Sequence, residues 1–313
     1  NIGNTRLQWE TTKRFNVGFE TNLINNRLNL RFNYFNSKTD HLLTYQALGF
    51  LTGIEKNWGN GGSLKNEGFD VTAVGKLVAM KSFQWELGLS VGHYKNKITS
   101  LADDATYFDS SVYGATIRTE VGKPANMFYG YVTDGVFSTS EEAAAAALYV
   151  LGDNGVDKNY FGAGDMRFVD LNGDHKIDEH DRTFIGDPNP DIYGNIFTTL
   201  AYKRFRLDVN FNYSLGNDVY NYMRSQLEGG SRFMNQTTAL TRRWQTEGQV
   251  TAIPKATFQD PMGNSRFSDR WIEDGSYLRL KTVTLSYRLP VNSTLLQGFE
   301  FWVQANNLLT FSK

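Results

Sequence analysis

The residues best suited to chemistry are oxygen-bearing side chains at alternating positions of the segment 170–181, DLNGDHKIDEHD. Counted from Asp170, they fall at positions one, three, five, nine and twelve, and position seven can add its backbone carbonyl. Calcium takes six to eight oxygen ligands from loops with this spacing. We therefore predict a structural Ca²⁺ site formed by Asp170, Asn172, Asp174, Lys176 (through its carbonyl), Asp178 and Asp181.

This acidic loop, residues 170–181, departs from the standard calcium loop in two places. Position six is His175, where the sharp turn prefers glycine, and position twelve is Asp181, which is shorter than the usual bidentate glutamate. The residues before the loop, MRFV, favour a strand rather than a helix. A solvated acidic turn is the alternative, and His175 with His180 leaves a transition-metal site open. No nucleophile or base accompanies the loop, so we expect its role to be structural.

Composition excludes several classes of function. The 313 residues carry a formal net charge of −1, which lacks the basic excess that a nucleic-acid partner requires. There is no cysteine, so disulfides and thiol catalysis are excluded. The sequence contains no glycine-rich phosphate loop, no His-x-x-x-His pair and no Gly-x-Ser-x-Gly motif. We expect no enzyme activity.

The ends of the sequence and its longest apolar runs are the places where a signal peptide or a transmembrane helix would lie. No run approaches 18 apolar residues, and the first residues lack the apolar core of a signal peptide. The sequence begins and ends within strand-like patterns. We therefore expect a fragment, or the ordered part of a longer protein.

The acidic loop is expected to be positioned by strands in which apolar and polar residues alternate. Near the start, Phe15, Val17 and Phe19 alternate with polar residues. The same pattern recurs as hairpins over about 11–38, 66–100, 192–222 and 276–309, with the last short link beginning at Pro290. Long connections separate the hairpins, over about 39–65, 101–191 and 223–275.

Strands of ten or more residues, joined alternately by short turns and long loops, are typical of outer-membrane barrels. A soluble sandwich has shorter strands. The fold class is therefore predicted to be all-β, a membrane-spanning antiparallel up-and-down β-barrel with long extracellular loops. Aromatic residues near the short turns predict an interfacial belt, with ordinary β-propensity as the alternative: Phe83, Trp85, Tyr202, Phe205, Tyr287, Phe299, Phe301 and Trp302.

The long connections hold two further features. A short helix should begin at a capping box formed by Ser138 with Glu141, or by Thr139 with Glu142. Aromatic side chains there are candidates for stacking on sugar rings or peptide side chains, although they are equally suited to packing the loops or meeting a partner: Trp58, Tyr107, Phe108, Tyr113, Tyr129, Tyr131, Tyr160, Phe161, Phe233 and Trp244. The ligand-binding residues themselves stay unknown at this stage.

Several stretches, in order along nearly the whole chain, resemble one family: LQWETTKRFNVGFE, NNRLNLRFNYFNSKT, NEGFDVTA, FYGYVTDGVF, DMRFVDLNGDHKIDEHDRTFIGDPNPDIYGN, SDRWIEDGSYLRLKTVTLSYRLP and FWVQANNLLTFSK. Together they resemble the C-terminal part of SusC-like (RagA-like) TonB-dependent outer-membrane transporters of Bacteroidota. The resemblance implies a barrel of about 22 strands filled by an N-terminal plug domain that this chain does not contain.

The resemblance also implies a function. Such a protein is located in the cell outer membrane, where it imports glycan oligosaccharides or peptides using energy delivered by TonB to the absent N-terminal part. Its expected partners are a SusD-like surface lipoprotein and outer-membrane lipid. Two alternatives stay open: a SusC-like barrel that serves as a non-transporting scaffold, and a soluble calcium-dependent glycan-binding β-domain.

Overall fold

The structure is a computed structural model that describes residues 5, 7–47, 56–290 and 298–312. Its main feature is a sheet of eight antiparallel strands, whose bounds in spatial order are β1 (Thr11–Leu23), β2 (Leu28–Asp40), β5 (Ser63–Ala79), β6 (Phe83–Ser100), β15 (Ile192–Tyr202), β16 (Phe205–Leu215), β19 (Tyr277–Leu289) and β20 (Phe299–Ser312). Within the described residues, β1 and β20 are the two edges and the sheet does not close on itself. The predicted all-β, antiparallel character is confirmed.

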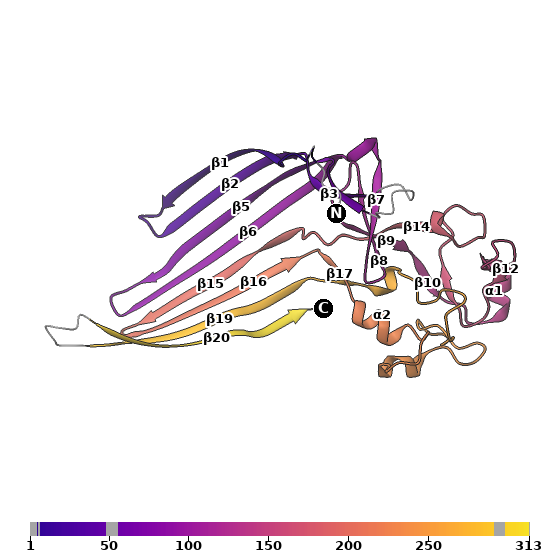
Figure 1. Cartoon of the computed structure of the whole chain (residues 1–313). Coiled ribbons are helices and arrows are strands. Elements are labelled where there is room, and N and C mark those ends of the chain that lie inside the picture. Colours follow the sequence, from indigo (N-terminus) through magenta and orange to yellow (C-terminus); the bar gives the residue numbers. More distant parts are fainter. Residues whose placement is uncertain (1–4, 6, 48–55, 291–297, 313) are drawn as a thin grey trace.

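Short turns lie at one end of this sheet and the long connections gather at the other (Figure 1). Between β1 and β2, Ile24, Asn25 and Asn26 take φ angles of 54°, 53° and 62°. Lys203, between β15 and β16, takes a φ of 55°. Positive φ angles match the turn to the twist of the paired strands, and asparagine tolerates them. The predicted link after Pro290 lies outside the described residues.

Strand bounds differ from the predicted hairpins where the backbone turns. The third hairpin ends at Leu215 rather than near residue 222, because Gly216 follows with a φ of 82° and leaves the extended conformation. The second hairpin begins earlier than expected, at Ser63, because β5 stays paired with β2 up to Asp40.

The alternation of side chains gives the sheet two different faces. One face is apolar across all eight strands, as in the row of directly opposed residues Phe19, Phe32, Val71 and Val91 on β1, β2, β5 and β6. We call it the apolar face. The opposite face is polar and carries ion pairs such as Arg31–Glu20, with 3.1 Å between Nη2 and Oε2.

The apolar face is exposed rather than packed against another layer. Phe15, Val17 and Phe19 on β1 are 62%, 52% and 60% exposed, and Val303 on β20 is 69% exposed. A contiguous apolar surface spread over eight strands is far larger than a monomer in water normally shows. This face must therefore be covered by a partner or by lipid.

The long connections fold into a module of their own, which we call the loop module. Its four-stranded sheet has the order β14 (Arg182–Gly186), β9 (Met127–Tyr131), β8 (Ala115–Glu120), β7 (Tyr107–Val112). Small pairs add β10 (Thr133–Val136) with β13 (Met166–Phe168), β11 (Tyr149–Leu151) with β12 (Lys158–Tyr160), β17 (Asp218–Tyr220) with β18 (Ile272–Asp274), and β3 (Leu43–Ala47) with β4 (Lys56–Asn60).

Helices in the loop module are short. They are α1 (Ser140–Ala146), α2 (Tyr222–Glu228) and the 3₁₀ turns η2 (Ala102–Asp104), η3 (Glu179–Asp181), η4 (Thr238–Arg242) and η5 (Asp269–Trp271). Thr139 caps α1 by accepting the Glu142 N–H, and the Glu142 carboxylate accepts from the N–H of Ser138. Across the residues that the structure covers, no helix is long and apolar enough to cross a membrane.

The core of the loop module joins segments that are distant in sequence. Its buried residues are Phe137, Ala143, Leu148, Val150, Phe161, Met166, Phe168 and Ile177. The buried carboxylate of Asp165 accepts from Lys255 at 3.0 Å and from the Asn264 side chain at 2.9 Å. These bonds hold the 223–275 connection against the 101–191 connection.

Glycine is required where β15 meets β6. A Cβ added at Gly194 would overlap the backbone carbonyl oxygen of Ser90, whereas one added at Gly75 meets only ordinary contacts, at 3.7 Å or more. We predict that Gly194→Ala lowers the free energy of unfolding by about 1–3 kcal/mol because the strands must separate locally. Denaturant titration should show this loss, with Gly75→Ala as the control; equal stability of the two variants would contradict the prediction.

Candidate sites in the loop module

The first half of the acidic loop is held by its own side chains. The Asp170 carboxylate accepts the N–H groups of Gly173 and His175, both at 2.8 Å. The Asn172 side chain accepts the N–H of Asp174 at 3.1 Å, and Asp174 accepts that of Lys176 at 2.8 Å. His175 takes the turn with a φ of 61°, so histidine occupies the left-handed conformation that usually favours glycine.

The second half of the acidic loop is organised by Asp178. Its carboxylate contacts Lys176 Nζ at 2.5 Å and accepts from the backbone and ring nitrogens of His180 at 2.8 and 2.9 Å. Partial burial acts to raise the pKa of Asp178, but the hydrogen bonds from Lys176 and His180 outweigh it and lower the pKa to about 2. Asp178 is therefore a carboxylate at neutral pH, and a cationic side chain already lies against it.

The acidic loop is anchored to the loop module by two buried side chains. Asp181 is fully buried, and its two carboxylate oxygens accept the N–H groups of Leu171 at 2.9 Å and Asp178 at 2.8 Å. Ile177 inserts into the apolar core of the module. The Asp181 carboxylate therefore closes the loop on both sides.

The six predicted calcium ligands lie in one loop, and side-chain oxygens of five of them, Asp170, Asn172, Asp174, Asp178 and Asp181, accept hydrogen bonds from the loop itself. Lys176 Nζ lies where a cation would neutralise Asp178, and Asp181 points into the module. In the part of the chain that the structure describes, no group of three or more Asp, Glu or His is arranged to hold a metal ion. The two histidines also separate, since His175 Nδ1 lies 3.2 Å from the carbonyl oxygen of Ala146.

Many aromatic residues of the loops pack against the protein. Tyr107 and Tyr129 enclose the guanidinium of Arg118, with centroid distances of 3.8 and 3.5 Å. Arg118 also makes a two-pronged bond to Asp109 at 2.8 and 2.9 Å, which raises the pKa of Arg118 although burial opposes the shift. These tyrosines therefore hold the four-stranded sheet together.

Of the other candidate aromatic residues, some pack against the protein and some are exposed. Tyr131 and Phe161 pack on Phe168, and the indole N–H of Trp244 donates to the Ser138 carbonyl at 3.1 Å. Phe233 is 92% exposed, with its ring 4.8 Å from that of Phe258. The exposed rings are the ones that remain available to a ligand or partner.

The loop module contains a further cavity, of about 510 Å³, that we call the arginine cavity. Its lining includes Arg224, Arg242 and Arg270 from three separate segments, together with Glu228. Arg224 pairs with Glu228 at 3.1 Å and with Glu273 at 2.8 Å. No sequence motif links positions 224, 242 and 270, so only the fold could reveal that they meet.

Arg270 is the unusual member of the arginine cavity. Its guanidinium lies 4.3 Å from the Trp271 ring centroid, and its buried Nη1 has no hydrogen-bond partner among the described residues. Burial, assisted by the charge of Arg224, lowers the pKa of Arg270 to about 10. An unpaired buried N–H of a charged group is costly. The described lining of the cavity contains three arginines and one carboxylate, Glu228. The cavity is therefore suited to an anionic group.

Comparison with known proteins finds similar receptors. No protein-family model matches the chain. Over 99% of its length the chain is 31% identical to TonB-dependent receptor P3 of Formosa agariphila and 29% identical to TonB-dependent receptor P26 of the same organism. It is also 26% identical, over 91% of its length, to TonB-dependent receptor SusC of Bacteroides thetaiotaomicron. The chain spans 30%, 31% and 26% of these three receptors.

Solved structures share the fold. All of the chain aligns with one third (33%) of a chain in the structure of the RagAB peptide transporter, with a TM-score of 0.80 and 24% identity. The RagAB peptide importer in its closed-closed state gives a TM-score of 0.78 at 25% identity. The chain is homologous to one part of the SusC/RagA-like TonB-dependent receptors, a family of transporters and not of enzymes.

The role of Asp181 can be tested directly. Asp181→Ala leaves the N–H groups of Leu171 and Asp178 without partners, at a cost of about 1–3 kcal/mol for each buried group. We predict faster hydrogen–deuterium exchange throughout 165–186. Asp174→Ala is the control, because Asp174 is exposed and restrains only the adjacent turn. Similar exchange in the two variants would show that Asp181 does not anchor the loop.

Proposed function

We propose that this chain forms a strand-and-loop part of an outer-membrane importer of the SusC type. The observation that carries the proposal is the exposed apolar face, which runs over eight long antiparallel strands and is backed by a polar, ion-paired face. That arrangement suits a barrel wall with lipid outside and a wet interior. Homology to TonB-dependent receptors supports the same conclusion.

In this proposal the eight strands belong to a closed, plugged barrel of about 22 strands. The hairpins β1–β2, β5–β6, β15–β16 and β19–β20 cross the membrane, and the long connections are extracellular. The plug and the segment that contacts TonB belong to parts of the receptor that this chain does not include. A SusD-like lipoprotein is the proposed partner at the loop module, supported by likeness to the RagAB structures.

The cargo is proposed to be an oligosaccharide or a peptide. The arginine cavity favours a cargo that carries an anionic group, because its described lining has three arginines and one carboxylate, Glu228. A peptide carboxylate and an acidic or sulfated sugar both offer such a group.

Uptake by cells that carry the full-length receptor tests this proposal. We predict that Arg242→Gln combined with Arg270→Gln lowers the uptake of an acidic oligosaccharide or peptide at least tenfold, because charge-assisted hydrogen bonds contribute about 1.5–3 kcal/mol each. The control pair, Arg204→Gln with Arg288→Gln, lies at the short-turn end and should leave uptake unchanged.

The outcomes separate the parts of the proposal. Equal uptake by the two variants would remove the arginine cavity from the cargo path. A receptor that imports nothing, even when TonB is present, would favour the scaffold alternative. Recovery of the receptor from the aqueous fraction without detergent would contradict the barrel itself.

Calcium binding by the acidic loop is a separate proposal, supported by the alternating oxygen side chains from Asp170 to Asp178. We predict that calorimetric titration of the detergent-solubilised receptor detects one Ca²⁺, and that Asp174→Ala weakens its binding. Asp103→Ala, outside the loop, is the control. Absence of calcium binding by the parent protein would refute the proposal and leave Lys176 as the cation of this loop.

A further inference from the structure

Four lysines form one straight row across four neighbouring strands. In the register of the sheet, Lys13 on β1 lies opposite Lys38 on β2, Lys38 lies opposite Lys65 on β5, and Lys65 lies opposite Lys97 on β6. We call these four residues the lysine row. Adjacent strands are about 4.8 Å apart, so the row is roughly 14 Å long.

The lysine row lies on the apolar face, at its long-loop edge. Directly opposed residues share a face of the sheet, and residues two apart along a strand do so as well. Lys13 follows the parity of Phe15, Val17 and Phe19, and Lys97 follows that of Val91. The row is therefore the polar border of the apolar face, and does not belong to the ion-paired face behind it.

Like charges placed directly opposite one another destabilise a sheet unless something compensates them. Lys38 pairs with Asp40 at 2.9 Å and Lys65 with Glu67 at 2.7 Å. Among the residues that the structure describes, Lys13 and Lys97 have no ion-pair partner, and neither has Lys95, one row nearer the apolar centre. On these four strands five positive charges thus face two carboxylates, and Asp187 and Asp191 add two more carboxylates at the adjoining cavity.

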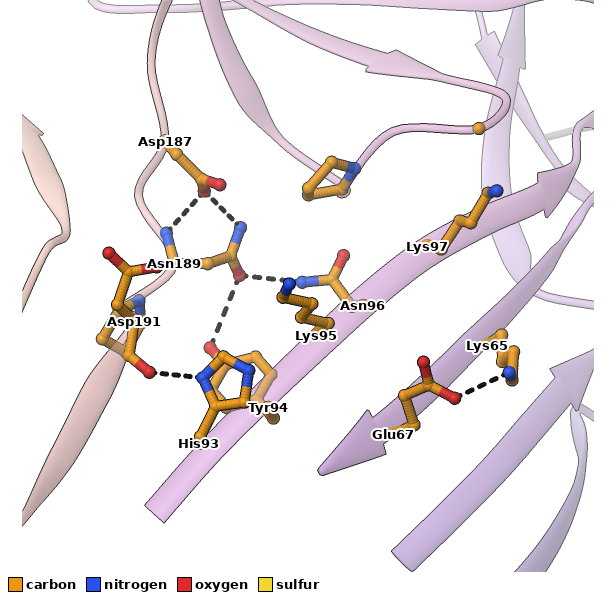
Figure 2. Close-up of a pocket in the computed structure, with 13 residues that line it drawn as sticks. Lys65, Glu67, His93, Tyr94, Lys95, Asn96, Lys97, Asp187, Asn189 and Asp191 are labelled. Atoms are coloured by element: carbon orange, nitrogen blue, oxygen red, sulfur yellow. Dashed lines mark hydrogen bonds and ion pairs between the residues drawn. The ribbon is translucent and has the colours of Figure 1, made fainter. Parts of the chain in front are cut away.

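A cavity of about 430 Å³ adjoins the end of this row (Figure 2). Lys65, Lys95 and Lys97 contribute to its lining on the sheet side. The opposite wall is the segment before β15, where Asn189 accepts from Asn96 at 2.9 Å and donates to Asp187 at 2.7 Å. In Figure 2, Lys65 reaches Glu67, whereas Lys97 lies apart from the other labelled side chains.

The opposite edge of the apolar face is also marked by one cross-strand row. Phe83, Tyr202, Phe205, Tyr287 and Phe301 are successive partners on β6, β15, β16, β19 and β20; we call them the aromatic row. Fourteen residues separate Phe83 from Lys97 along β6. At about 3.3 Å per residue and a tilt of about 40°, the two rows are roughly 35 Å apart along a membrane normal.

That separation exceeds the hydrocarbon thickness of about 30 Å but not the full bilayer of about 40–45 Å. With Phe83 at one interface, Lys97 falls within the headgroup layer on the long-loop side. Because the lysine row runs perpendicular to the tilted strands, its four members are spread over roughly 9 Å of depth around that level. Lysine side chains extend along apolar surface and keep the ammonium in the polar layer, where it meets phosphate as a point charge.

We propose that the lysine row, with Lys95, binds the phosphate groups of phosphorylated lipids in the membrane leaflet beside the long loops. The inference rests on the proposed membrane location of the sheet. A row of ammonium groups that crosses four neighbouring strands, continuous with the apolar face, suits headgroups whose acyl chains cover that face. An anionic ligand without acyl chains would not use the apolar border.

The test uses the full-length receptor in detergent and compares binding of lipid A with binding of its dephosphorylated form. The variant carries Lys13→Gln, Lys38→Gln, Lys65→Gln and Lys97→Gln, and the matched control carries Lys76→Gln, Lys81→Gln, Lys158→Gln and Lys203→Gln. A lysine near an anionic surface contributes about fivefold to affinity, so loss of the two unpaired lysines alone should weaken lipid A binding about 25-fold. The control should bind as the parent does.

Three results would overturn the inference. They are equal binding of the phosphorylated and dephosphorylated lipids, equal weakening in the variant and the control, and competition by inorganic phosphate at the same concentration as lipid A. Loss of a lipoprotein partner in the variant, with lipid binding intact, would assign the row to that partner instead.

Failure of the membrane proposal can be distinguished from failure of the lysine-row proposal. A receptor that floats with vesicles of pure phosphatidylcholine, yet shows no preference for phosphorylated lipid, retains the membrane location and loses only the lysine row. A receptor that does not enter such vesicles contradicts the proposed function itself. Circular dichroism of the variant establishes that it has folded before binding is measured.

Discussion

Register across the eight-stranded sheet is the constraint on which the rest of the structure depends. Because side chains alternate along a strand, a shift of one residue would move every apolar side chain of that strand to the polar face. The observed register instead aligns Phe19, Phe32, Val71 and Val91 in one row. Close backbone approach reinforces it: Gly194 faces the Ser90 carbonyl where no side chain would fit. The same register defines the two border rows.

The strands and their turns could be predicted from sequence because their determinants are local. Alternation marks each strand, and residues such as Asn25 and Asn26 mark the turns. The loop module could not be predicted in this way, since its core and its polar contacts join distant segments. Asp165 meets Lys255 and Asn264 across about ninety residues, and no local pattern records that pairing. The arginine cavity could not be predicted from sequence for the same reason.

The acidic loop shows that one motif can have two physical explanations. The spacing of oxygens suggested a cation as the element that rigidifies a long connection. In the structure, Asp170, Asn172 and Asp174 bond to backbone N–H groups of the loop, Asp181 closes it from beneath, and Ile177 anchors it in the core. Side chains that can ligate calcium can equally satisfy a tight turn. Sequence spacing alone does not distinguish the two, because both need oxygens at alternating positions.

The two edges of the apolar face constrain its proposed position in a membrane more than its centre does. Apolar residues at the centre would interact with lipid in the same way as one another. The aromatic row at one edge and the lysine row at the other differ in chemistry from the centre and from each other. Amphipathic rings prefer the interface, and lysine requires a polar, preferably anionic, layer. Since both rows are fixed to β6 by register, they cannot move independently. In the proposed membrane location, the backbone ladder would set both the depth of the wall in the bilayer and which leaflet meets the lysine row.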